Sequence, residues 1–415
     1  MSQPPLPAAG PRRFTQGEVD LVCARHDRFW RSKPGGARAV FSHGDLSGLD
    51  FSARNLTDAD FTGAILAHAD FSRARLDNAN LFAADLQMAT LIEASLRRAD
   101  LRGASLRGAD LTGADLFEAD LREGTLAAAD TERGYRVLEH TQRVSNAVGA
   151  NLRGANLQRS KLSGIIAVKA DFSDAIMKDA KLVRANLKQA TLHGADLAGA
   201  DLSGADLSGA DLSDAILVGA KTAAWTTDKA NMDGVLTDRP QGADAAGLPW
   251  QAMLEGHALW CESGGAKGAP SNFDKADLRV ISSIKGMNLT ALSARGAIFY
   301  GLDMEAVQLQ GAHLEGADLR GCNMRGADLR GARLVGAKLS GADLRQAHLG
   351  PLLIGAERLL PADLTRAILK TADLSGADLR AAILSGADLE RANLTGAVMR
   401  QAILDGANLA GAKGL

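Results

Sequence analysis

Two cysteine–histidine pairs are the residues of this chain that come nearest to a reactive or metal-binding site. Cys23 and His26 stand three positions apart, and His257 and Cys261 stand four positions apart. Two thiols and two imidazoles can hold zinc in tetrahedral geometry. When the two segments are aligned, however, each cysteine falls opposite an apolar residue of the other segment. Burial in a hydrophobic core is therefore the favoured interpretation of both pairs.

Regularly spaced aspartates could supply paired carboxylates for acid–base chemistry or a calcium site. No acidic pair departs from the regular pattern, and the Gly-Gly-x-Gly-x-Asp calcium repeat is absent. An aspartate that bonds its own backbone in a turn is the favoured interpretation. The chain also lacks the GxGxxG, GxxxxGK[ST], HExxH, CxxC and GxSxG motifs. We therefore predict no catalytic, cofactor-binding or metal-binding residues, and no enzyme.

Long stretches of the chain have a leucine, or a similar residue, at every fifth position, and this spacing predicts the backbone that carries these side chains. We call such a series of every-fifth residues the comb. This comb runs over 41–126, resumes over 152–217 with the exception of Ala167, and returns over 289–409 with the exception of Ala294. Five steps of about 100° would scatter the leucines around a helix. In an extended segment, residues two apart share a face, and Ala usually precedes each leucine by two positions. Each pentad therefore offers one small and one large inward side chain.

The other pentad positions carry Asp or Asn before the leucine and often Gly two residues after it, as in GADLAGADLSGADLSGADLSDAIL at 194–217. These residues favour a turn after each short strand. A chain that bends in the same direction after every pentad winds into a solenoid.

The A(D/N)LxG pattern resembles the pentapeptide-repeat proteins over about three-quarters of the chain. The resemblance implies an all-β solenoid, a right-handed quadrilateral β-helix with four pentads in each coil. It implies little about activity, because a fold does not settle a function.

An internal duplication predicts two modules of this fold. Residues 19–30 and 250–261 place apolar side chains at helical spacing, and each segment precedes a Gly-rich turn and the first pentads. We expect each helix to cap the open apolar end of a column. The expected cap residues are Val22, His26, Trp30, Met253, His257 and Trp260.

The predicted boundaries are a disordered leader at 1–16, a first module at 17–236, a linker at 237–249 and a second module at 250–415. An excursion at 127–150 loses the comb and is expected to form a short helix or loop. Between Leu278 and Leu289 the phase slips by one residue.

Two charged residues fall on inward positions of the comb. Glu357 lies between Pro351 and Pro361, and we expect a local bulge there that turns its carboxylate outward, since an isolated buried charge is costly. Arg54 raises the same problem, for which a frayed first coil is the expected explanation.

Composition sets further limits. Only 4% of the 415 residues are aromatic, so the core must be built from Leu and Ala. Three cysteines favour a reducing compartment, and the leader lacks the apolar core of a secretory signal, so we expect a cytoplasmic protein. Polar residues interrupt every apolar run well before the roughly 20 residues that a membrane helix needs.

Charge bears on one function that the resemblance suggests, since some family members bind DNA gyrase by imitating the negative surface of duplex DNA. Residues 41–126 contain 11 Asp, 3 Glu and 8 Arg, whereas residues 151–236 hold 10 acidic and 10 basic residues. Arginines beside many of the aspartates neutralise such a field. A direct nucleic-acid binder would need a basic stripe with interleaved aromatics, which is absent.

We therefore predict a rigid, non-catalytic scaffold that binds a protein partner, with no cofactor and no contact with membrane or nucleic acid. The alternative is an inhibitor or protector of DNA gyrase, of the quinolone-resistance type. We also expect the open C-terminal end to bury itself in a homodimer. The candidate interaction residues are Tyr135, Arg136, His140, Glu357, Arg358 and Leu409.

Overall fold

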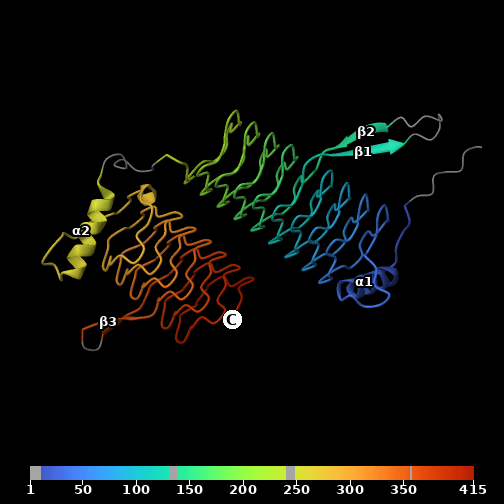
Figure 1. Cartoon of the computed structure of the whole chain (residues 1–415). Coiled ribbons are helices and arrows are strands. Elements are labelled where there is room, and N and C mark those ends of the chain that lie inside the picture. Colours follow the sequence, from blue (N-terminus) through green and yellow to red (C-terminus); the bar gives the residue numbers. More distant parts are fainter. Residues whose placement is uncertain (1–10, 130–137, 240–247, 356–357) are drawn as a thin grey trace, which may run out of the picture. The chain divides into compact units, whose positions relative to one another are not determined.

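The computed structural model describes residues 11–129, 138–239, 248–355 and 358–415. The chain divides into two compact units, Met1–Asp238 and Arg239–Leu415, and each unit has its own hydrophobic core. Each unit consists of stacked coils preceded by one helix (Figure 1). Among the residues described, no helix combines the length and the apolar character that crossing a bilayer requires.

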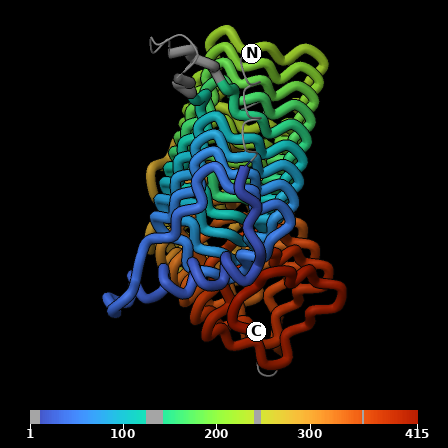
Figure 2. Tube along the Cα trace, turned by 90° about the vertical axis from the view of Figure 1, so that its right-hand side faces the viewer, coloured from blue at the N-terminus to red at the C-terminus, as the bar shows by residue number. Residues whose placement is uncertain are grey.

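The coils of each unit stack through parallel bridges between residues that are 20 positions apart in the chain. Asp50 bridges Asp70 in the first unit, and Asp303 bridges Asn323 in the second. Twenty residues are four pentads, so each coil has four sides and contributes one bridging residue per side. The coils accordingly repeat one outline along the first unit (Figure 2). Short bridges of this kind replace long strands, as the pentad pattern predicts.

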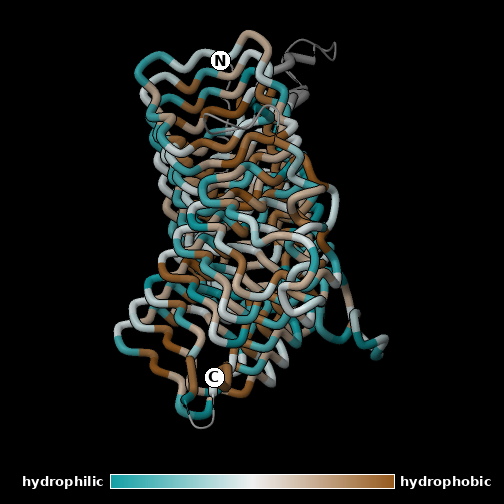
Figure 3. The backbone as a smooth tube through the Cα atoms, turned by 90° about the vertical axis from the view of Figure 1, so that its left-hand side faces the viewer, coloured by the Kyte–Doolittle hydropathy of each residue, from teal (hydrophilic) through white to brown (hydrophobic). Residues whose placement is uncertain are grey.

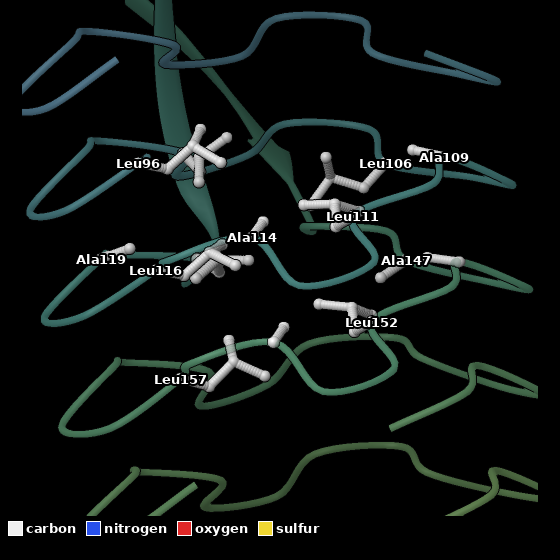
Figure 4. Packing of buried hydrophobic residues seen from close by; sticks show 14 of the residues in the cluster. Leu96, Leu106, Ala109, Leu111, Ala114, Leu116, Ala119, Ala147, Leu152 and Leu157 are labelled. Atoms are coloured by element: carbon white, nitrogen blue, oxygen red, sulfur yellow. The ribbon is translucent and has the colours of Figure 1, made fainter. Parts of the chain in front are cut away.

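The interior is a ladder of leucines and alanines. Leu96, Leu116 and Leu157 lie above one another in successive coils, with alanines beside them (Figure 4). Leu197, Leu202 and neighbouring comb residues are completely buried. Each buried leucine contributes about 1.5–3 kcal/mol. Apolar and polar residues alternate along the coils, as their opposite orientations require (Figure 3).

Two alanines that interrupt the comb are compensated within their own pentads. Ala167 takes a leucine position, and Ile165 fills the preceding alanine position with its side chain buried. Leu292 and Ala294 make the same exchange in the second unit. The total inward volume of the pentad is thereby kept, which is what a close-packed interior requires.

Helix α1 (Gln16–Trp30) covers the first coil of the first unit. It begins at a capping box, in which Thr15 and Glu18 satisfy each other's backbone N–H groups. Arg54 donates to Asp20 of this helix at 2.7 Å. The first coil keeps its bridges to the next coil, so the expected fraying is wrong: Arg54 instead forms an ion pair with the helix.

Helix α2 (Trp250–Glu262) stands before the second column and buries Leu254 and His257. Trp250 packs against Phe273 of the first coil, with ring centroids 5.8 Å apart. A 3₁₀ turn, η1 (Leu278–Val280), then takes up one extra residue, because Asp277 bridges a partner 21 positions later. The predicted slip of phase is confirmed.

Part of the expected leader is ordered. The Asp45 N–H donates to the Arg12 carbonyl at 2.8 Å, and the Phe14 N–H donates to the Asp45 carbonyl at 2.9 Å. Residues 11–15 therefore pair with the free edge of the first coil, whose backbone groups would otherwise lack protein partners. The predicted disorder is wrong for this part, and residues 1–10 lie outside the described residues.

The excursion in the first unit is a β-hairpin of strands β1 (Gly124–Ala129) and β2 (Leu138–Arg143). Asp120 bridges Lys161, 41 positions later, so 21 extra residues leave the column between these two coils. The predicted helix or loop is wrong, and the comb ends at Leu121 rather than Leu126. Loss of the pentad pattern shows where the chain leaves the column, but the pairing of the two strands depends on their register with each other.

A second hairpin, strands β3 (Leu352–Ile354) and β4 (Arg358–Leu360), leaves the second column. Ten residues are inserted, since Arg333 bridges Asp363, 30 positions later. Ten residues equal two pentads, so the comb keeps its phase although two pentads lie outside the column. The predicted bulge is therefore wrong, and Glu357 itself lies outside the described residues.

Glycine at 331 makes room for this hairpin. Gly331 has φ +66°, and a Cβ added there would lie 2.8 Å from Leu352 Cβ. Leu352 and Leu360 thus rest on the column, whereas Leu353 and Leu359, opposite each other in the hairpin, are 60% and 59% exposed.

The compensated pentad gives a test of the packing. We expect Ile165→Ala to cost about 2–5 kcal/mol through the cavity that it leaves, and Ala167→Leu to cost about 1–3 kcal/mol through overpacking. The double variant restores the usual pentad, so its free energy of unfolding should lie close to that of the wild type. Urea denaturation of all four proteins measures the coupling. Additive losses in the double variant would contradict the exchange.

Candidate interaction surfaces

The outward side chains follow from which residue comes after each leucine. Where Arg follows, as in Asp318-Leu-Arg320, the guanidinium lies beside the aspartate two positions earlier. Arg320 Nε and Nη2 donate to the two carboxylate oxygens at 2.9 and 2.6 Å. This geometry recurs at six further pairs: 100/102, 120/122, 277/279, 328/330, 343/345 and 378/380. Such a pentad neutralises its own charge.

Where Ser or Thr follows the leucine, no guanidinium of the same pentad balances the negative charge of the aspartate. The Ser72 N–H and hydroxyl both donate to Asp70 Oδ1, at 2.8 and 2.6 Å. The hydroxyl and N–H of Ser52 likewise lower the pKa of Asp50 from its ordinary value. These bonds stabilise the carboxylate as an anion without adding a positive charge.

One side of the first column is built mostly from pentads of the second kind. Its bridging residues run in the order Asp50, Asp70, Thr90, Asp110, Asn151, Asp171, Thr191, Asp211 and Asn231. We call the outward residues of these pentads the acidic face. Its charged members are Asp50, Asp70, Arg73, Glu93, Asp110, Arg153, Asp171, Asp174, Asp211, Asp214 and Asp233.

The acidic face has nine acidic and two basic residues, a formal net charge of −7. The same sorting gives each of the other three sides of this column a net charge within about one unit of zero. The two arginines already hold partners, since Arg73 contacts Glu93 at 3.1 Å and Arg153 contacts Asp174 at 3.5 Å. The remaining carboxylates define a negative stripe along one flat side.

One serine–histidine contact lies on this face, and its geometry is not that of a hydrolase. His193 Nδ1 is 2.9 Å from Ser213 Oγ. The nearby carboxylate of Asp211 accepts the N–H of Ser213 at 3.0 Å, so it lies on the serine side rather than behind the imidazole. In a catalytic triad the carboxylate orients the imidazole. No cluster of three or more His, Cys, Asp or Glu suited to a metal occurs among the described residues.

The expected cap residues all lie on α1 or α2. His26 and His257 are buried, whereas Val22, Met253 and Trp260 are half-buried. Trp30 is 44% exposed, and its indole N–H donates to the Thr57 carbonyl at 3.1 Å. Neither cysteine–histidine pair belongs to a metal cluster; Cys23 is buried, and burial raises its pKa to about 11.

The candidate interaction residues are dispersed. Tyr135, Arg136 and Glu357 lie outside the described residues, and His140 is described only by its backbone, which pairs with Ala127. Arg358 is exposed on β4. The structure brings none of the described ones together into a single site.

Leu409 lies half-buried in the last coil of the second column. In the same region Val398 and Ile403 are 47% and 43% exposed. Leu394 donates its N–H to the Lys413 carbonyl, and the inward residues after it, such as Met399 and Leu404, are only half-buried. This end is therefore an apolar surface.

A net charge counted along the chain does not reveal the acidic face, because successive pentads lie on four different sides and their charges are averaged. The signal that could have revealed it is an aspartate followed by Ser or Thr at intervals of 20 residues. Using this signal also requires the length of the β1–β2 insertion, because the aspartates at 110 and 171 are two whole coils apart only when 21 residues are removed.

A family model for pentapeptide repeats matches the chain in eight copies and covers more than half of it. The matched residues are 55–91, 84–122, 150–189, 185–221, 308–346, 362–396 and 382–413. No curated protein matches the chain.

Solved structures similar to this chain carry the same repeat. HetL of the cyanobacterium Nostoc, a pentapeptide-repeat protein involved in regulating heterocyst differentiation, is 23% identical over 94% of this chain and 98% of its own, with TM-score 0.14. Rfr23 of the cyanobacterium Cyanothece is 28% identical over 32% of this chain and 88% of its own, with TM-score 0.18. QnrB1, a plasmid-mediated fluoroquinolone resistance protein, is 20% identical over 56% and 94%, with TM-score 0.18. Scores this low support no comparison of individual sites.

The hydroxyl that follows Asp50 can be tested directly. Ser52→Ala removes it, and the pKa of Asp50 should rise toward its ordinary value near 3.9. Because a depressed carboxyl pKa stabilises the fold above about pH 4 and this contribution is lost as pH falls through the folded pKa, the variant's deficit should disappear in acid. Carbon-13 NMR titration of aspartate carboxyls measures the pKa. Ser52→Thr is the control that keeps the hydroxyl, and an unchanged Asp50 pKa in the alanine variant would refute the assignment.

Proposed function

The chain belongs to the pentapeptide-repeat family, and we propose that it is a non-catalytic scaffold that binds a protein partner through the acidic face. The family fold is a right-handed quadrilateral β-helix, and the family is generally non-enzymatic. The observation that carries the proposal is the net charge of −7 on one side of a column whose other sides are close to neutral.

Rigid spacing makes this side suitable for recognition. Neighbouring coils lie about 4.8 Å apart, as hydrogen-bonded strands do. Five carboxylates of this face accept bonds from their own pentads, so little side-chain entropy is lost there when a partner binds: those of Asp50, Asp70, Asp110, Asp171 and Asp211. A partner with lysines and arginines along a helix or strand complements such a stripe. Charge complementarity of this kind raises association rates and is weakened by salt.

Binding of DNA gyrase through DNA mimicry is a second candidate, and the same acidic face favours it. Duplex DNA, however, is negative all around its axis. A column with one negative side and three neutral sides imitates a strip of that surface only. We therefore rank recognition of a basic protein surface above gyrase binding.

The three cysteines are free, and thiols persist in reducing compartments, so we propose a cytoplasmic location.

The acidic face can be neutralised without disturbing its turns. Asparagine already occupies this position at Asn151, where its Oδ1 accepts the Arg153 N–H at 3.1 Å. The variant with Asp→Asn at 50, 70, 110, 171 and 211 should therefore fold normally and lose its partner. A control with the same number of Asp→Asn changes in self-neutralised Asp-Leu-Arg pentads, at 100, 120, 318, 328 and 343, should keep it.

Quantitative pull-down from cells of the source, at two salt concentrations, supplies the readout. A protein captured by the wild type and the control but not by the face variant supports the proposal. Equal capture by all three rejects the acidic face as the interface. If purified wild-type protein inhibits DNA supercoiling by gyrase and the face variant does not, the second candidate holds instead.

We also propose that the C-terminal end of the second column pairs with the same end of another copy. A two-fold axis would bury Val398, Ile403 and the half-buried residues around Leu409. Sedimentation at micromolar concentration should give a dimer for the wild type and a monomer for Val398→Lys/Ile403→Lys. The matched control is Val280→Lys, since Val280 is 63% exposed but far from this end in the coil order. A wild-type monomer under these conditions would exclude the pairing.

A further inference from the structure

His26 is completely buried between helix α1 and the first coil. Its Nδ1 accepts the N–H of Ala39 at 3.0 Å, so the ring is neutral and carries its proton on Nε2. Nε2 is buried without a well-formed hydrogen bond, because the Thr57 carbonyl faces the ring but does not reach bonding geometry. A second proton would remove the acceptor that holds Ala39 and place a charge in an apolar site.

The second unit holds the matching ring differently. His257 Nδ1 accepts the Ser271 N–H at 3.1 Å, and His257 Nε2 lies 3.1 Å from the Thr290 carbonyl. In the first unit the corresponding carbonyl, that of Thr57, accepts from the indole of Trp30. Both ring nitrogens of His257 therefore have hydrogen-bond partners, whereas Nε2 of His26 has no well-formed hydrogen bond.

The charged groups that face His26 are Asp27 on its own helix, Asp58 from a turn of the first coil and Arg38 from the segment that enters the column. Burial lowers the pKa of His26, and the Thr57 carbonyl and the two aspartates oppose this effect only in part. The neutral ring is thus the form that the folded cap accommodates.

We propose that protonation of His26 releases helix α1 from the first column, so that mild acid opens the capped end while the column itself stays folded. The polar contacts that would remain are the ion pair between Arg54 and Asp20, the bonds of Gln16 to Asp50 and the bond of Trp30 to the Thr57 carbonyl. Exposed pairs of this kind contribute about 0–1 kcal/mol. Release uncovers the inward residues of the first coil, Phe41, Leu46, Phe51 and Leu56.

Cys23 reports the opening, because it lies on α1 three residues before His26 and is 1% exposed. A pyridyl disulfide should label Cys23 faster as the pH falls below about 6.5, by up to about tenfold per pH unit. Each labelling rate is divided by the rate for a peptide of residues 19–27 at the same pH, which corrects for the reactivity of the free thiol. Cys322, and a cysteine placed at Ala195 in the first column, should stay unlabelled. Equal protection of Cys23 at pH 7.5 and 5.0 would overturn the proposal. Labelling of Cys23 together with the cysteine at 195 would overturn it too, since it would mean global unfolding.

Two variants test whether His26 is the group responsible. His26→Asn keeps an acceptor near the place of Nδ1 but cannot gain a proton, so its normalised labelling should not depend on pH. The matched change His257→Asn should leave the acid response of Cys23 intact. Asp58→Asn removes a carboxylate that favours the protonated ring in the closed cap, so the acid response should still begin near about pH 6.5 but continue to lower pH and reach a higher labelling rate. If His26→Asn already exposes Cys23 at neutral pH, Asp58→Asn still tests the assignment. A pH dependence of Cys23 labelling identical to that of the wild type would overturn the assignment of His26.

Discussion

The hydrogen bond from each leucine N–H to a carbonyl of the next coil is the constraint on which the rest of the structure depends. Leu202 donates to the Lys221 carbonyl at 2.8 Å, and Leu207 donates to that of Thr226 at 2.7 Å. Because these bonds join residues about 20 positions apart, every pentad stacks on another pentad of the same side. The interior ladder of leucines and the sorting of outward charges by side both follow from this register.

The two inserted hairpins leave the stacking register of the coils unchanged, so each side of a column stays continuous. The β1–β2 hairpin adds 21 residues, yet Asp110 still bridges Asn151 and Asn151 still bridges Asp171. The acidic face therefore runs through the insertion without a change of side. A hairpin that closes on itself returns the chain to the corner that it left, so surface elements can be added without disturbing the core.

The repeated pentad predicted the solenoid, the inward leucines and the slip near Leu278, and the helical spacing of apolar residues at 19–30 and 250–261 predicted the helices before each column. Both patterns are local, so the sequence alone carries them. The hairpins could not be predicted, because their strands pair with each other in a register that no pentad encodes. The second hairpin also inserts ten residues, the length of two pentads, so the five-residue spacing does not show the insertion. The exchange of Ile165 with Ala167 looked like an exception until its two members were seen to fill one layer of the core. The acidic face required the stacking order itself, since residues such as Asp70 and Asp171 share a side only after the insertion is placed.

Stacking concentrates negative charge on one side of the first column. The most direct measurement is the electrostatic potential near backbone amides, obtained by NMR from relaxation caused by cationic and anionic nitroxides in solution. Amides around residues 70–73, 110–113 and 171–174 should show a clearly negative potential, while those around 100–103 and 161–164, on another side, should lie close to zero. A similar potential on all sides of the column would contradict the account.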